Sequence, residues 1–165
     1  SGAFTALSRL DYLGRCGAAL ACLGQETLPT QPRKSISRVY PSGWDQRSYE
    51  FIDEGVLYNR CHLIAFSLCG ENDNERNLIT GTRAMNVDGM KPLEEQTVRY
   101  IERTHNHVLY CVTPLFEEGE LVARGVHMEA YSLEDDGAGL NFNVYCYNNQ
   151  PGVVIDYVTG ASHAS

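Results

Sequence analysis

One segment of this chain, PLEEQTVRYIERT at residues 92–104, has the pattern of a helix and lies between segments that have the pattern of strands. Pro92 suits a first helical turn, and the side chains recurring at three- and four-residue spacing are Leu93, Thr97, Tyr100, Ile101 and Thr104. The segments HVLYCVTPLF and LVARGVHMEAYSL follow, and EEGE at residues 117–120 separates them, which predicts a β-hairpin. A helix between strands predicts an α+β fold with an antiparallel sheet.

Two further strands are predicted, one on each side of that helix. LNFNVYCYN at residues 140–148 alternates in polarity, with Phe142, Val144 and Cys146 turned toward the core. LIT at residues 78–80 is a shorter strand that precedes the helix. The chain therefore contains a strand-loop-strand-helix unit followed by an antiparallel sheet.

The remaining segments are less regular. Residues 56–66 predict a strand that enters an ordered turn, and this turn would present His62. Residues 28–44 contain three prolines and predict an extended loop with a short strand near residues 36–40. Residues 9–23 fit either a helix or a pair of short strands.

Length and composition indicate one globular domain. We expect residues 1–165 to form a single domain with its own core. Hydrophobic residues make up 43% of the chain and charged residues 21%, which excludes a disordered chain. No apolar run approaches the roughly 20 residues that cross a bilayer, and the first residues lack a signal pattern and an initiator methionine, as in a processed chain. The net charge of -8 counts against tight, non-specific DNA binding but leaves room for a local basic cleft.

The six cysteines form no recognisable metal or disulfide pattern. Their number is even, but no two are spaced as a CxxC pair. The chain is also longer than the small disulfide-framed domains in which cysteine counts are informative. One or two disulfides and a zinc site stay open as minor alternatives to free thiols. The cysteines are Cys16, Cys22, Cys61, Cys69, Cys111 and Cys146.

The segment LYNRCHLIAF at residues 57–66 concentrates polar and reactive side chains between apolar ends. Adjacent residues of an extended chain point to opposite faces, so Cys61 and His62 are poorly placed to ligate one metal or to act as a Cys/His pair. A phosphate-attacking site remains, in which His62 is a general base near neutral pH and Arg60 offers a fixed positive fork. Such a site also needs a hard cation with oxygen ligands.

Those oxygen ligands are available in TGTRAMNVDGMKPLEE at residues 80–95. The amide oxygen of Asn86 is followed eight positions later by the carboxylate of Glu94. If the helix begins before Asn86, two turns place both side chains on one face. Two structural roles compete with this interpretation, namely Asn86 as a helix cap and Glu94 or Glu95 as first-turn acids that favour the helix dipole.

Several motifs together resemble one known family. NRCHLIAF, NLITGTRAMN and QPGVVIDYVTG, with LGRCG, PSGW and HVLYCVTPLF as a wider frame, resemble the bacterial DNA/RNA non-specific endonucleases, which are ββα-metal (His-Me finger) nucleases. The resemblance extends over residues 13–160 and points to the branch related to secreted streptococcal-type DNases. It implies a ββα-metal core in which a central antiparallel sheet is flanked by helices and long loops.

The resemblance also implies roles for individual residues. His62 falls on the general base that activates water, Asn86 on the metal-ligating asparagine and Glu94 on the glutamate that supports the hydrated metal. Arg60 falls on the motif arginine that faces the phosphate. The weaker candidates for further phosphate contacts are Arg83 and Arg15.

The implied activity is hydrolysis of DNA and also RNA with little sequence preference, dependent on Mg²⁺ with Mn²⁺ as a substitute, and leaving 5′-phosphate ends. Such a protein would be secreted, with nucleic acid as substrate and an inhibitor or immunity protein as a further partner. Two alternatives stay open: a catalytically silent secreted binding module of the same fold, and the nuclease tip of an antibacterial toxin.

The motif departs from its commoner Asp-Arg-Gly-His form at two positions, because Asn59 and Cys61 replace the aspartate and the glycine. Neither change removes the base. The missing acid raises the question of what orients the His62 ring, and we expect a backbone carbonyl to do so. Cys61 is expected to be packed and inert.

Overall fold

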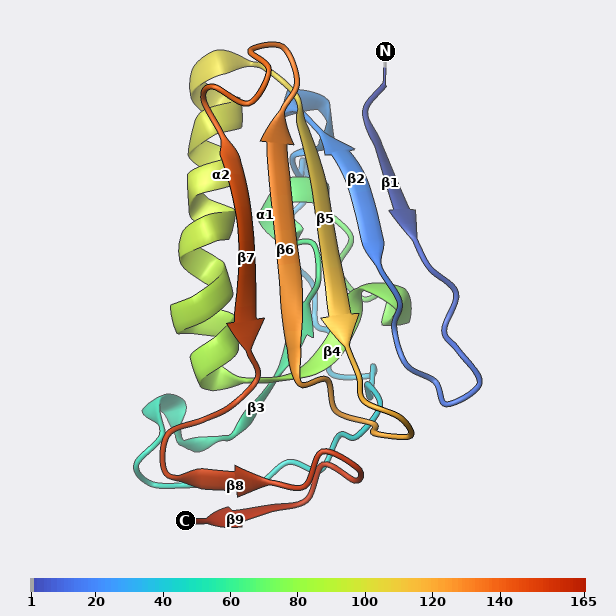
Figure 1. Cartoon of the computed structure of the whole chain (residues 1–165), viewed down its shortest axis with the longest axis vertical. Helices are drawn as coiled ribbons and strands as arrows, with labels where there is room; N and C mark the ends of the chain where they lie inside the picture. Colours follow the sequence, from blue (N-terminus) through green and yellow to red (C-terminus); the bar gives the residue numbers. More distant parts are fainter. Residues whose placement is uncertain (1) are drawn as a thin grey trace.

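A five-stranded antiparallel sheet and one long helix dominate the structure (Figure 1). The computed structural model describes residues 2–165. The strands are β1 (Phe4–Leu7), β2 (Ala19–Leu23), β3 (Tyr58–His62), β4 (Leu78–Thr82), β5 (Val108–Leu115), β6 (Gly125–Ser132), β7 (Asn141–Tyr147), β8 (Val153–Ile155) and β9 (Ser162–Ala164). The helices are η1 (Gln25–Thr27), η2 (Asp53–Gly55), α1 (Phe66–Cys69), η3 (Glu75–Asn77), η4 (Ala84–Met90) and α2 (Lys91–Thr104). In residues 2–165 no helix is both long and apolar enough to span a membrane.

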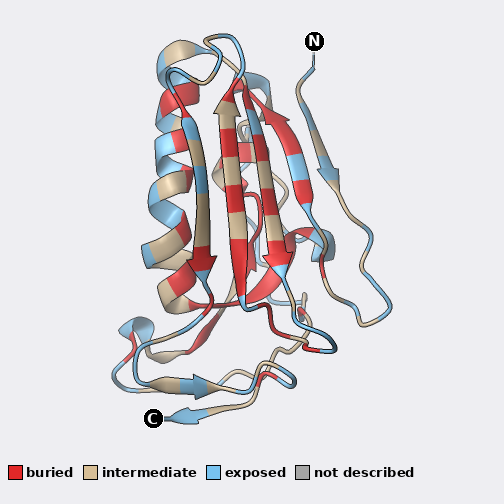
Figure 2. Ribbon diagram, viewed as in Figure 1, coloured by how far each residue is buried: buried red, intermediate tan, exposed pale blue. Residues whose placement is uncertain are grey.

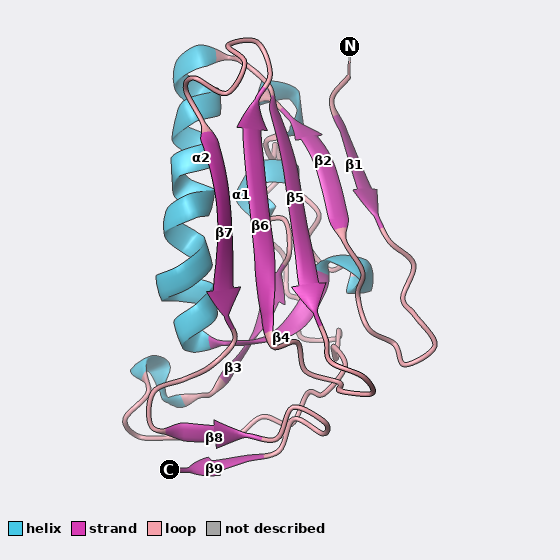
Figure 3. Ribbon diagram, in the orientation of Figure 1, coloured by secondary structure: helices cyan, strands magenta, loops and turns pink. Residues whose placement is uncertain are grey.

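The main sheet has the order β1-β2-β5-β6-β7, and all neighbouring strands in it are antiparallel (Figure 3). The predicted hairpin is confirmed, because β5 and β6 pair from Val108 opposite Ser132 to Leu115 opposite Gly125. The predicted strand at residues 140–148 is β7. Together with the long helix, these strands confirm the α+β class.

The helix predicted at residues 92–104 is α2, which begins one residue earlier. Its inward stripe contains Thr97, Tyr100 and Ile101, and His105 ends the helix in a left-handed conformation. The helical path begins before α2, because the π-helix η4 runs directly into it and the Lys91 N–H donates to the carbonyl of Asn86. Asn86 therefore lies inside a continuous helical segment.

The second layer of the fold is the unit formed by β3, β4, η4 and α2. β3 and β4 are antiparallel, and Figure 1 shows them behind the main sheet with α2. One apolar cluster joins the two layers, and it includes Cys61, Ile79 and Ile101 from this unit and Tyr110 and Met128 from the sheet. In Figure 2, buried positions recur along β5 and β6, because alternate side chains of these strands point into this cluster. This packing fixes the ends of β3 and η4 relative to each other.

Three local predictions are corrected or decided by the structure. No strand forms at residues 36–40; a turn closes there instead, with the Val39 N–H donating to the Ile36 carbonyl. Residues 59–61 belong to β3 itself rather than to a turn, because cross-strand pairing continues to the strand end. In the region of residues 9–23, neither predicted alternative is correct, because only one strand forms there, β2, and it pairs with β1, which precedes the region.

All six cysteines are free. In residues 2–165 no group of three or more His, Cys, Asp and Glu side chains is placed to hold a metal ion. Neither the disulfide alternative nor the zinc alternative is therefore correct. Cys146 lies in the core, as its place in the strand pattern predicts, and Cys61 has no exposed surface.

Candidate active site

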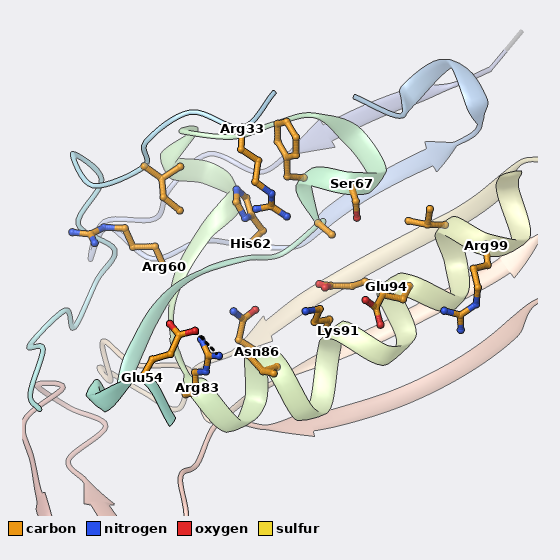
Figure 4. A pocket seen from close by; sticks show the side chains of 16 residues that line it. Arg33, Glu54, Arg60, His62, Ser67, Arg83, Asn86, Lys91, Glu94 and Arg99 are labelled. Carbon is orange, nitrogen blue, oxygen red and sulfur yellow. Dashed lines mark hydrogen bonds and ion pairs between the residues drawn. The ribbon is translucent and has the colours of Figure 1, made fainter. Parts of the chain in front are cut away.

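A cleft of about 700 Å³ lies between the end of β3, the helical segment from η4 into α2, and the loop around Arg33. Figure 4 shows His62 and Arg33 on one side of it and Asn86, Lys91 and Glu94 along the helix on the other. The charged residues that line it are the cations Arg33, Arg60, Arg83, Lys91 and Arg99 and the acids Glu54, Glu94 and Glu95. Cations outnumber acids here although the chain has a net charge of -8, so the cleft is a local site for anions.

His62 is the last residue of β3 and is almost buried, with 9% of its surface exposed. Its Nε2 donates a hydrogen bond of 2.8 Å to the backbone carbonyl of Asn72. The carbonyl only accepts, so Nε2 carries the proton of the neutral ring and Nδ1 keeps a free lone pair. The expectation that a backbone carbonyl orients this ring is confirmed.

The surroundings of His62 favour the neutral imidazole. Burial lowers the pKa of His62 below its ordinary value, the hydrogen bond to Asn72 opposes this shift, and the nearby Arg33 guanidinium lowers the pKa further. A histidine that stays neutral to lower pH is suited to accept a proton.

Asn86 lies within the π-helix η4, which places it on the cleft side of the helical segment. A π-helical turn is uncommon and occurs often at functional sites. The Asn86 amide nitrogen donates to Asn59 Oδ1 at 3.0 Å, and the Cys61 thiol lies 3.3 Å from Asn86 Oδ1. Asn86 does not cap the helix, because the N-cap position of this segment is Arg83.

Glu94 and Glu95 both line the cleft, but only Glu94 is buried, with 8% of its surface exposed. Burial raises the pKa of the Glu94 carboxyl to about 7, the positive charge of Arg33 opposes this, and Glu95 adds to it. Burial makes the charged form of this carboxyl group unfavourable, and a bound cation would relieve that cost.

Arg60 lines the cleft and is held there by the loop that precedes β3. Its Nε donates to the Val39 carbonyl at 2.5 Å and its Nη2 to the Ser37 carbonyl at 3.1 Å. The guanidinium also lies 4.3 Å from the ring centroid of Trp44 and 5.0 Å from that of Tyr40. These contacts fix the plane of the guanidinium at the edge of the cleft.

Arg83 also lines the cleft, with its guanidinium 3.1 Å from Glu54 (Figure 4). The same guanidinium lies 3.4 Å from Asp53. The Nε of Arg83 is buried and has no hydrogen-bond partner in the described part of the chain. Both acids are largely exposed, so these ion pairs are weak and leave Arg83 able to meet an anion.

Arg15 does not reach the cleft, which corrects the expectation that it contacts phosphate there. Its Nε pairs with Asp11 at 2.8 Å, and its Nη1 donates to the Glu118 carbonyl at 2.7 Å and the Glu120 carbonyl at 3.1 Å. The guanidinium lies 5.0 Å from the Phe116 ring centroid. Arg15 joins two loops and is structural.

Three cations of the cleft were not predicted from the sequence, namely Arg33, Lys91 and Arg99. Lys91 and Arg99 are two helical turns apart on α2, and this spacing was a usable signal. Arg33 lies in a proline-containing loop without periodicity, and its place beside His62 depends on contacts distant in sequence. It also lies over the Phe66 ring, 5.0 Å from the centroid.

The fold and the cleft together are those of metal-dependent phosphodiesterases, hydrolases that act on nucleic acids. The chain belongs to the DNA/RNA non-specific endonuclease family, whose sequence profile matches residues 3–133. No curated protein sequence matches the chain significantly.

Solved structures of streptococcal nucleases are similar to the whole chain. NucA from Streptococcus agalactiae without metal is 27% identical, with a TM-score of 0.88 over 100% of this chain and 79% of NucA. The same nuclease with a magnesium ion bound is 26% identical, with a TM-score of 0.89 over 100% of this chain and 81% of NucA. Sda1 nuclease with a bound zinc ion is 28% identical, with a TM-score of 0.87 over 98% of this chain and 81% of Sda1.

Proposed function

We propose that this protein is a Mg²⁺-dependent endonuclease that hydrolyses DNA, and RNA as well, with little sequence preference and leaves 5′-phosphate ends. The observation that carries the proposal is the cleft itself, in which His62 with a free Nδ1 faces the helix that bears Asn86 and Glu94. A base, an amide oxygen and a carboxylate among cations are the groups that phosphodiester hydrolysis needs.

The residues present fit a divalent cation with oxygen ligands. Asn86 would ligate it directly through Oδ1, and the buried Glu94 carboxylate would hold its hydration shell. Magnesium gives up its waters reluctantly and so suits a site with one direct protein ligand, while Mn²⁺ has similar ligand preferences. When bound, the cation would neutralise charge that develops on the phosphate and on the departing 3′ oxygen. The magnesium bound by NucA supports this proposal.

The side chains divide the remaining work. Nδ1 of His62 takes a proton from the attacking water while the Nε2–H bond to the Asn72 carbonyl keeps the ring in place. The water attacks the phosphorus in line with the 3′ oxygen, whose departure leaves the phosphate on the 5′ side. Arg60 and Arg83, which both line the cleft, bind phosphate oxygens and hold the substrate there.

The proposal is tested by incubating plasmid DNA and an RNA transcript with the purified protein, with and without EDTA. We expect degradation without a preferred cutting site, its loss in EDTA, and its return on addition of Mg²⁺. Ligation without prior kinase treatment would identify 5′-phosphate ends. DNA left intact at saturating Mg²⁺ and Mn²⁺ would contradict the proposal and favour a silent binding module.

The acid limb of the rate profile is expected at lower pH than an ordinary histidine gives. Only neutral His62 accepts a proton, and burial together with Arg33 lowers its pKa, so the active form persists to more acid pH. Removing the Arg33 charge by Arg33→Gln should therefore move the acid limb upward. The measurement is the initial rate against pH, with Mg²⁺ saturating throughout because Glu94 has a pKa of about 7 without a cation.

Arg99→Gln is the matched control for that experiment, since Arg99 lines the same cleft but is not among the groups that shift the pKa of His62. Its acid limb should coincide with that of the parent. An acid limb of the parent above the ordinary imidazole pKa of about 6.5 would contradict His62 as the base.

Binding of DNA is expected to depend only moderately on salt. The cleft holds five cations, and the acids Glu54, Glu94 and Glu95 that also line it offset part of their charge. Three or four phosphate contacts give a slope of about -3 in a plot of log K against log salt. Fluorescence anisotropy with duplex DNA and Ca²⁺ in place of Mg²⁺ measures this slope. A slope near -9, the value for about ten contacts, would reveal a second basic surface.

We further propose that residues 1–165 form one endonuclease domain that acts outside the cell. The contiguous apolar cluster supports the single domain. Two further proteins of similar structure, described as an extracellular endonuclease and an extracellular nuclease, support secretion.

A further inference from the structure

The amide of Asn86 is held at both ends by residues of β3. Asn59 and Cys61 lie two positions apart on this strand, so their side chains point to the same face, toward η4. Asn59 Oδ1 accepts from Asn86 Nδ2 at 3.0 Å, and the Cys61 thiol donates toward Asn86 Oδ1 at 3.3 Å. The two contacts meet opposite ends of one amide group.

The strand pair is built to hold the Cys61 side chain in this place. Gly81 lies on the neighbouring strand β4, and a Cβ added there would be 2.6 Å from Cys61 Cβ and 3.2 Å from Cys61 Sγ. Any larger residue at position 81 would therefore displace the thiol. Cys61 is fully buried, and its sulfur also lies 3.5 Å from Met90 Sδ. The sulfur is therefore held within reach of Asn86 Oδ1, which is nearer than its two other acceptors, Met90 Sδ and the His62 carbonyl.

The orientation of the Asn86 amide is the quantity that these contacts control. The terminal torsion of asparagine is broad and roughly two-fold, so the oxygen and the NH₂ group can exchange places at little intrinsic cost. Asn59 alone does not decide between the two arrangements, because its own amide can offer either an oxygen or an NH₂ group. A thiol at the other end favours one arrangement, because its proton meets the oxygen of Asn86 while its sulfur is only a weak acceptor for the NH₂ group.

We propose that Cys61 is a positioning residue, whose thiol selects the orientation in which Asn86 Oδ1 is available to the cation. The inference rests on the proposed role of Asn86 as metal ligand. An S–H donor is weak, and it leaves the second lone pair of Oδ1 free for the cation. A carboxylate at position 59 would fix the same orientation, because it can only accept a hydrogen bond and so can pair only with the NH₂ group of Asn86.

The test is a double-mutant cycle read out by binding of Mn²⁺ alone, without DNA, from the electron paramagnetic resonance signal of the free ion. Cys61→Ala is expected to raise the Kd for Mn²⁺ about tenfold, the lower end of the range for residues that orient metal ligands. In the Asn59→Asp background, the carboxylate already fixes the Asn86 amide, so the same Cys61→Ala change should alter the Kd by less than about twofold. A change of that size lies within the deviation found between independent sites. At saturating Mg²⁺, the nuclease activity of Cys61→Ala should return to that of its parent, both alone and in the Asn59→Asp background.

Two further variants separate positioning from packing. Cys146→Ala removes a buried thiol that lies 3.9 Å from Met128 Sδ and does not touch Asn86, so its Kd should equal that of the parent. Cys61→Ser keeps a side chain of nearly the same size and a proton donor at the same place, and it provides a second test should Cys61→Ala not fold. Its Kd for Mn²⁺ should stay near the parent value, whereas a loss as large as that of Cys61→Ala would show that the donor does not orient Asn86.

The outcomes distinguish this inference from the proposal on which it rests. An unchanged Kd in Cys61→Ala, or an equal loss in the Asn59→Asp background, overturns the positioning role while the metal site stands. If the parent binds no Mn²⁺, or if Asn86→Ala binds it as tightly as the parent, the metal site itself is wrong and the inference falls with it.

Discussion

Replacing His62 by glycine is expected to slow hydrolysis by a factor of about 10² to 10⁴, the usual contribution of a general base. The hydrogen bond from Nε2 to the Asn72 carbonyl keeps the proton of the His62 ring on Nε2, so the Nδ1 lone pair is free to accept a proton from water. Without the ring, only bulk water or buffer can take the proton. Initial rates on plasmid and on a short duplex, both at saturating Mg²⁺, measure the loss.

The variant must be shown to fold and bind before its rate is interpreted. Circular dichroism should match that of the parent, and DNA affinity in Ca²⁺ should stay near the parent value, since the cleft cations are untouched. His163→Gly is the matched control, because His163 is exposed on β9 away from the cleft residues. A His62→Gly protein within about tenfold of the parent rate has lost less than any usual base contribution, which would exclude His62 as the base.

Asn86→Ala is expected to raise the Mg²⁺ concentration that gives the half-maximal rate, because the direct protein ligand is lost. The increase should exceed about tenfold, the change expected when only a residue that orients a ligand is removed. Asn86→Asp keeps an oxygen at the same place and adds a charge, so its midpoint should equal or fall below that of the parent. Rates measured over a range of Mg²⁺ give these midpoints.

Thermal unfolding of both Asn86 variants provides the control, since η4 should tolerate either side chain. An Asn86→Ala protein with an unchanged Mg²⁺ midpoint would show that this amide is no ligand. Its role would then be confined to the hydrogen bond with Asn59.

Local periodicity was sufficient to predict the helix at residues 92–104 and the strands at residues 108–147, because each buries one regular face against the core. The motif around His62 and the spacing to Asn86 were sufficient to predict that both side chains line one cleft. Polar residues in the middle of β3 hid the strand, since cross-strand pairing rather than hydrophobic alternation holds them there.

The remaining features depend on contacts between distant segments. Alternation along β3 correctly separates Cys61 from His62, but nothing in the sequence shows that Asn86 would pack against the Cys61 face. Arg33 and the turn at residues 36–40 lie in a segment without periodicity. Arg15 lies in the LGRCG motif, which belongs to the family resemblance. Its guanidinium nevertheless donates hydrogen bonds to two loop carbonyls and is not available to the cleft.

The most direct measurement of the central claim is chemical rescue of His62→Gly by added imidazole. The missing ring leaves a space of its own size beside the Asn72 carbonyl, so imidazole should restore part of the rate in a concentration-dependent way. With His62 as the base, the rescued rate rises with the neutral fraction of the added imidazole and follows the pKa of that molecule, not the lowered pKa of His62. Substituted imidazoles of other pKa values should move the profile accordingly. A rescued rate whose pH profile ignores the pKa of the added imidazole would contradict proton transfer at this position.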